Sequence, residues 1–120
     1  PEVKGILGTS SFDAPGTARA IDELGLKGKV FTAGTGLPNA NKQILQDGSV
    51  ASLTLWDPAD AGYAMASLAT KILNGEKIAD GVNLGVTGYE NMHFSPGSTK
   101  VLEGNGWIQI NKDNVDSFGF

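Results

Sequence analysis

Cysteine is absent from this chain of 120 residues. Its absence excludes a disulfide framework, a thiolate metal site and a thiol nucleophile, and it leaves the cellular compartment open. Basic residues are outnumbered, with 9 Lys and Arg against 13 Asp and Glu, a formal charge of −4 and no block of like charges. Nucleic-acid-binding proteins usually carry a basic stripe, so this balance argues against a nucleic-acid partner. No apolar run approaches the roughly 18–20 residues of a membrane-spanning helix, and the sequence predicts none.

Catalytic signatures are also missing from the sequence. No serine lies in a G-x-S-x-G elbow. The single histidine is His93, and Glu90 is its nearest acid, with no second carboxylate at helical spacing. A triad or metal cluster would need unusual partners, so we expect a surface histidine, no enzyme, no metal and no cofactor. The chain begins at Pro1 without the charged and apolar segments of a secretory leader, and we expect a processed or partial product.

Glycine, in contrast, is abundant, with 17 residues, about twice its usual share of roughly 7%. The 40% apolar fraction is too high and too periodic for disorder. Strand and helix patterns alternate with short connections, which is typical of an α/β domain with a parallel sheet. The expected strands cover residues 3–9, 29–33 and 50–56, and the expected helices cover residues 13–24, 38–47 and 59–74. Five of the 17 glycines fall at expected helix ends or in a strand-to-helix loop: Gly25, Gly48, Gly75, Gly34 and Gly36.

The most strongly predicted element is the helix that follows Asp57 and Pro58 and ends at Gly75. Asp57 is its expected cap, and Asp13 is the expected cap of the first helix. The polar residues of the helix that follows Asp57 form one narrow stripe, so we expect this helix to pack against a sheet or between other elements. The tail is polar and rich in glycine, with short strand-like pieces expected at residues 82–86, 100–102 and 107–110.

Ligand-binding residues are expected where the strands end, because open parallel α/β sheets bind ligands beyond the carboxyl ends of their strands. Hydroxyl groups, an indole face and a carboxylate suit a small, neutral, polyhydroxylated ligand. The residues at these positions are Thr9, Ser10, Ser11, Thr35, Trp56 and Asp57.

An alternative interpretation is that Trp56 fills the core and the serines cap a helix, and the strand pattern leaves both open. Trp56 shares a strand face with Ser52 and Thr54, which favours a less buried side. A weaker alternative is a nucleotide-binding enzyme, because Gly34-x-Gly36 resembles the start of a dinucleotide fingerprint. Asn39 stands where the third glycine belongs, so that fingerprint is broken.

The residues of the expected ligand site lie in segments that resemble the C-terminal part of type I periplasmic sugar-binding proteins of ABC transporters. The resemblance is strongest to the branch that contains the rhamnose-binding and autoinducer-2-binding proteins. Its most specific part is the Leu-Trp-Asp-Pro segment with the Gly-Tyr helix that follows. The similar segments are residues 3–25, 34–40 and 53–63, with residues 94–96, 104–106 and 110–114 in the tail.

The resemblance implies a three-layer parallel α/β lobe within an incomplete two-lobe architecture. Residues 1–56 would be a βαβαβ segment of the C-terminal lobe, and residues 57–120 a crossover helix and tail belonging largely to the other lobe and the hinge. Family members are more than twice this length, so the N-terminal lobe would be missing. We expect half a protein, in the form of a proteolytic fragment, a deliberate truncation or one chain of a split protein. Half a cleft should bind sugar weakly or not at all.

The resemblance also implies the function. The protein would capture a small sugar or sugar-like ligand between two lobes for import through an ABC permease. It would act in the periplasm, or outside the cell on a lipid anchor in a Gram-positive organism. The loop at residues 9–11 would supply hydrogen bonds, partly from its backbone, and Trp56 would pack on the ligand. Some members carry an acid where Ser10 stands and others an acid near Thr35, which leaves the sugar unidentified. The alternative is the ligand-sensing domain of a sugar-responsive transcription regulator, because bacterial repressors share this fold.

Overall fold

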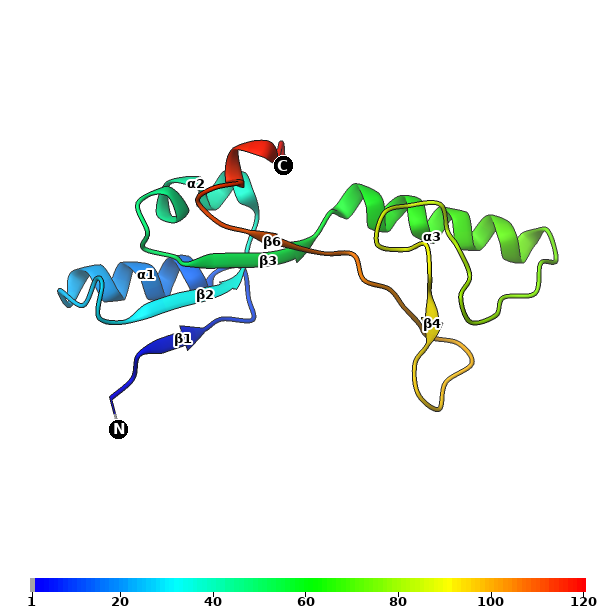
Figure 1. Ribbon diagram of the computed structural model, residues 1–120, viewed down its shortest axis with the longest axis horizontal. Coiled ribbons are helices and arrows are strands. Elements are labelled where there is room, and N and C mark those ends of the chain that lie inside the picture. The colour runs from blue at the N-terminus through cyan, green and yellow to red at the C-terminus, as the bar shows by residue number, and fades with distance from the viewer. Residues whose placement is uncertain (1) are drawn as a thin grey trace. The chain divides into compact units, whose positions relative to one another are not determined.

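A computed structural model describes residues 2–120, which divide into two compact units (Figure 1). The first unit contains the residues up to Leu55 together with Ile108–Phe120. The second unit is Trp56–Trp107. The chain therefore leaves the first unit after Leu55 and re-enters it at Ile108.

The first unit is built on a four-stranded sheet in the order β1-β2-β3-β6. The strands are β1 (Gly5–Leu7), β2 (Phe31–Thr35), β3 (Ser52–Trp56) and β6 (Trp107–Ile110), and the helices are α1 (Asp13–Glu23) and α2 (Pro38–Gln46). β1 pairs with β2 and β2 pairs with β3, both in parallel. This arrangement confirms the predicted α/β class with a parallel sheet.

One face of this sheet carries the core of the first unit. α1 and α2 cover it, because a side chain at Gly34 would meet Ala14 of α1 and one at Gly36 would meet Asn41 of α2 (Figure 1). A short 3-10 turn (Val115–Ser117) also contacts α2. The buried residues of this core are Ala14, Ala18, Leu45, Val50, Leu53, Leu55, Ile110 and Val115. Burying a leucine there contributes about 1.5–3 kcal/mol.

The opposite face of the sheet is open. Leu7 is 83% exposed and Phe31 is 54% exposed. Within residues 2–120 the first unit therefore has helices on one face only. The second helical layer implied by the resemblance is not among the described residues.

Two element ends differ from the prediction. α1 begins at Asp13 but is not capped by it, since its N-cap residue is Phe12, with no side-chain hydrogen bond. β2 runs two residues further than expected, so Thr35 is its last residue rather than part of a loop. The strand also begins later, because the N–H groups of Lys29 and Val30 donate to the carbonyl of Leu26 and hold a turn. Both changes come from hydrogen bonds between residues only three or four positions apart in the chain.

The second unit consists of α3 (Pro58–Leu73), long loops and a two-stranded antiparallel sheet of β4 (His93–Phe94) and β5 (Leu102–Glu103). α3 is capped by Asp57 and followed by Gly75 at φ 76°, as predicted. The expected strand over residues 82–86 is wrong, because only Val82 pairs there, in a single bridge to Met92.

The packing of α3 differs from the prediction of a helix that lies against a sheet or between other elements. One side contacts loops of its own unit, with a small core of Ala64, Leu84 and Met92. The exposed apolar side chains on this helix are Tyr63, Met65, Ile72 and Leu73. Within the described residues no sheet covers that side. Among the helices of residues 2–120, none has both the length and the hydropathy that a membrane-spanning helix needs.

Candidate functional site

The polar strand ends of the first unit meet at one edge of its sheet. The N–H of Gly8 donates to the carbonyl of Ala33 at 2.9 Å, so the end of β1 lies beside β2. The loop at residues 9–11 and the end of β2 at Thr35 therefore follow neighbouring parallel strands. Residues 9–11 are exposed and Thr35 is half-buried. Four of the six predicted ligand residues thus share this edge.

Asp13 holds the loop at residues 9–11 in place. Its Oδ2 accepts the backbone N–H groups of Thr9 and Ser10, each at 2.9 Å. Gly8 allows this contact, because a Cβ there would collide with the Cβ of Asp13. The prediction of Asp13 as a helix cap is therefore wrong, because the preceding loop uses its carboxylate. These two N–H groups are therefore engaged within the loop itself.

Gly34 and Gly36 are explained by close packing. A Cβ on Gly34 would lie 2.9 Å from the carbonyl oxygen of Gly8, and one on Gly36 would lie 2.8 Å from Asn41 Nδ2. At the start of α2, the N–H of Asn39 donates to the oxygen of Phe120 at 3.1 Å. A nucleotide phosphate would need such N–H groups, so this geometry argues against the dinucleotide interpretation.

The other two predicted residues, Trp56 and Asp57, belong to the second unit. Trp56 is 47% exposed and is not a core residue. Asp57 is half-buried, and its Oδ1 accepts the N–H groups of Ala59 at 2.7 Å and Asp60 at 3.4 Å. One oxygen of this carboxylate therefore caps α3.

Trp107 was missed as a candidate residue. Its ring meets that of Trp56 edge to face, with ring centroids 5.5 Å apart and an angle of 82°. The two rings line a small pocket of about 160 Å³ with Tyr89, Gly104 and Gly106. A signal was present in the sequence, because the alternation Trp-Ile-Gln-Ile places residues 107 and 109 on one face of a strand. The burial pattern of β6 follows that alternation.

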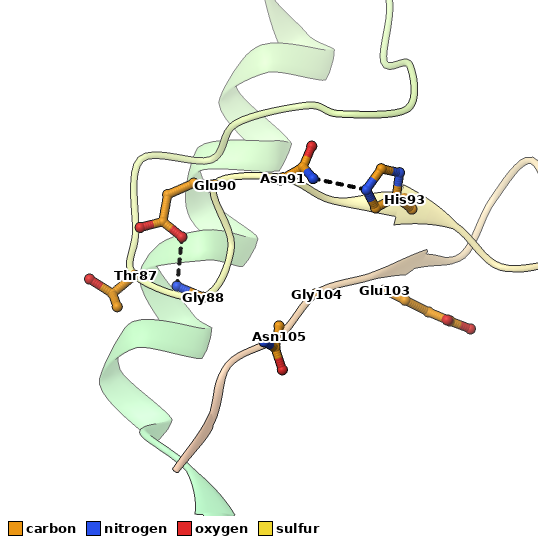
Figure 2. Close-up of a pocket in the computed structure, with 8 residues that line it drawn as sticks. All are labelled: Thr87, Gly88, Glu90, Asn91, His93, Glu103, Gly104 and Asn105. Carbon is orange, nitrogen blue, oxygen red and sulfur yellow. Dashed lines mark hydrogen bonds between the residues drawn. The ribbon is translucent and has the colours of Figure 1, made fainter.

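A larger hollow of about 680 Å³ lies beside β4 and β5 (Figure 2). Three of its polar side chains serve local contacts: Glu90 accepts the N–H of Gly88 at 2.7 Å, and Asn91 lies 3.0 Å from Nε2 of His93. Figure 2 shows Glu90 and His93 turned to these different neighbours. His93 is exposed, and no cluster of three metal-ligating side chains occurs in the described part of the chain.

Asp47, at the end of α2, has a perturbed pKa. Hydrogen bonds from Ser49 lower the pKa of this carboxyl, and Lys27, whose Nζ lies 3.6 Å from Oδ1, lowers it further. This cluster closes the turn after α2, where Gly48 has φ 76°. It stabilises the turn and stands apart from the polar strand ends.

Comparison with known families identifies the chain. The family model described as the periplasmic binding protein domain matches residues 1–77. The chain belongs to the periplasmic binding protein family. This is a family of solute-binding proteins rather than enzymes.

Solved structures agree with this periplasmic binding protein fold. A sugar ABC transporter structure from Actinomyces odontolyticus has 28% sequence identity and a TM-score of 0.79, over 100% of this chain and 38% of that one. LsrB from Clostridium saccharobutylicum in complex with AI-2 has 23% identity and a TM-score of 0.68, over 98% of this chain and 40% of that one. GanP, a glucose-galactose binding protein from Geobacillus stearothermophilus, has 22% identity and a TM-score of 0.67, over 95% of this chain and 33% of that one. The binding-protein chain thus spans two fifths or less of the length of these relatives.

Proposed function

We propose that this chain is the C-terminal portion of a solute-binding protein that captures a small sugar or sugar-like ligand between two lobes for ABC import. The observation that carries the proposal is the hydroxyl-lined edge formed by residues 9–11 and Thr35, in a chain of a solute-binding family. The likeness to a sugar ABC transporter structure at 28% identity supports a sugar rather than another solute.

The proposed ligand is neutral and carries several hydroxyl groups. Each threonine and serine hydroxyl at the edge can donate one hydrogen bond and accept others, which matches a sugar hydroxyl. One oxygen of the Asp13 carboxylate, Oδ2, already accepts two N–H groups of the loop itself. Trp56 would cover an apolar C–H face, and the second oxygen of Asp57 would accept a ligand hydroxyl.

We propose that the complete protein acts outside the cytoplasmic membrane, in the periplasm or on a lipid anchor, and delivers its ligand to an ABC permease. An N-terminal lobe is the proposed partner of the exposed side of α3. The apolar residues Tyr63, Met65 and Leu73 are exposed there, and the relatives are more than twice as long as this chain. Covering these side chains with the missing lobe would remove their apolar surface from water.

The test is calorimetric titration of the full-length protein with monosaccharides, including rhamnose and galactose, and with AI-2. We expect one ligand to bind, and we expect Trp56→Ala to weaken that binding by about 1–3 kcal/mol. Thr35→Val removes one hydroxyl at nearly constant shape and should also weaken binding. Thr99→Val, in an exposed loop of the second unit, is the matched control and should bind normally. A full-length protein that binds none of these ligands contradicts the proposal.

A further inference from the structure

The two tryptophans of the chain form a corner that is open to solvent. Trp56 is 47% exposed and Trp107 is 61% exposed, yet their rings meet nearly at right angles. Edge-to-face contact is a favourable geometry for two aromatic rings, so the contact between the two indoles stabilises their relative orientation. The corner therefore presents large apolar surface that the described chain does not cover.

Glycines shape the wall behind this corner. A Cβ on Gly106 would lie 2.6–2.7 Å from the hydroxyl oxygen and two ring carbons of Tyr89, so only glycine lets that ring lie against the strand leading to Trp107. Gly88 has φ 81°, and a Cβ there would lie 2.6 Å from Gly106 Cα. The N–H of Asn105 ties the same segments by donating to the Gly88 carbonyl at 2.8 Å. Tyr89 is thus fixed as the third aromatic wall of the pocket.

The size and chemistry of the pocket limit its occupant. Its volume of about 160 Å³ is well below the roughly 300–1,000 Å³ of sites for drug-sized ligands, so it has room for one ring. No charged side chain lines it, since the other lining residues are Gly104 and Gly106. Aromatic faces suit C–H groups, and the Tyr89 hydroxyl can serve a hydroxyl at the rim of the ring.

We propose that Trp107 is a second ligand-contacting tryptophan, and that the Trp56–Trp107–Tyr89 pocket selects a single sugar ring with one unhydroxylated C–H face. The inference rests on the proposed function and goes beyond it in two respects. It adds Trp107 and Tyr89 to the ligand contacts, and it restricts the ligand to the size of a monosaccharide.

The test compares the full-length wild type with three Trp107 variants by calorimetry, using the best-bound monosaccharide and a disaccharide that contains it. Trp107→Ala should raise the Kd roughly 5- to 100-fold. Trp107→Leu keeps apolar bulk but removes the flat face, and it should show a similar loss even if the alanine variant folds poorly. Trp107→Phe should stay near wild type. Val101→Ala removes exposed apolar surface of the same unit outside the pocket and is the control.

A second readout locates the contact on the ligand. Saturation-transfer NMR with irradiation of aromatic protons should label the C–H protons of one ring face, and Trp107→Leu should reduce that labelling. Unchanged affinity in all Trp107 variants, with losses in Trp56→Ala and Thr35→Val, overturns this inference and leaves the proposed function standing. Equal affinity for the disaccharide overturns the restriction to one ring. A wild-type protein that binds no sugar overturns both proposals.

Discussion

Asp57 combines a structural role in α3 with a proposed role at the ligand, and substitutions can separate the two. Its Oδ1 lies 2.7 Å from the N–H nitrogen of Ala59 but 3.4 Å from that of Asp60, so one strong hydrogen bond does most of the capping. Loss of an N-cap side chain costs about 0.5–2 kcal/mol. The negative charge at the helix N-terminus contributes about 0.3–1 kcal/mol of interaction with the helix dipole. Asp57→Ala should therefore lower the free energy of unfolding by about 1–2 kcal/mol.

Asp57→Asn is the informative partner variant. Asparagine is about as good an N-cap as aspartate, so only the charge contribution should be lost, about 0.3–1 kcal/mol. Urea unfolding of the full-length protein measures both variants, and hydrogen exchange at the amide of Ala59 reports on the cap itself. Equal stability of wild type and Asp57→Ala would refute the capping argument.

Ligand affinity measured on the same two variants tests the second role. If the free oxygen of Asp57 accepts a ligand hydroxyl, Asp57→Asn should lose affinity while it keeps most of its stability, because an amide accepts more weakly than a carboxylate. Wild-type affinity in Asp57→Asn would remove Asp57 from the ligand contacts. Its capping role would stand regardless.

Three further outcomes follow from contacts in the two units, each measurable by unfolding of the full-length protein. Gly106→Ala should displace the Tyr89 ring and destabilise the fold by about 1–3 kcal/mol, and a wild-type melting curve would contradict that packing. Asp13→Ala leaves two backbone N–H groups without their carboxylate, so it should cost about 1–3 kcal/mol and speed their hydrogen exchange, which unchanged exchange would disprove. Asp47 has a lowered pKa through Ser49, so it stabilises the fold above the unfolded pKa of about 3.8 and loses that effect as pH falls through the folded pKa. The stability difference between wild type and Asp47→Asn should shrink in that acidic window, and a difference independent of pH would contradict the assignment.

Local signals allowed the sequence to predict much of the fold. Asp57 and Gly75 mark the ends of α3 through a cap and a left-handed residue, and both act within a few residues of the helix. The alternation of strands and helices likewise depends on short-range periodicity. These features need no knowledge of distant parts of the chain, and they were predicted correctly.

Features that depend on distant or competing partners were missed. Asp13 has the right type and position for a helix cap, but Gly8 leaves room for its carboxylate to bind the preceding loop instead. Trp107 becomes a candidate residue through its ring contact with Trp56, which lies far away along the sequence. Of the antiparallel pair, the strand expected at residues 100–102 overlaps β5 at Leu102, whereas β4 was missed because two residues are too short for a periodic pattern. The polar edge at Thr35 could be predicted from the sequence, because the carboxyl ends of neighbouring parallel strands lie at the same edge of a sheet.

Both tryptophans of these 120 residues stand where the chain passes between its two units, since the first unit stops at Leu55 and resumes at Ile108. The two passages, separated by the whole of the second unit in sequence, are thus in contact through a pair of indoles. Indole emission from this chain arises from this junction alone, and perpendicular rings at 5.5 Å are close enough for their electronic transitions to couple. Near-ultraviolet circular dichroism of the two indoles can therefore report on the contact between Trp56 and Trp107 without any added label.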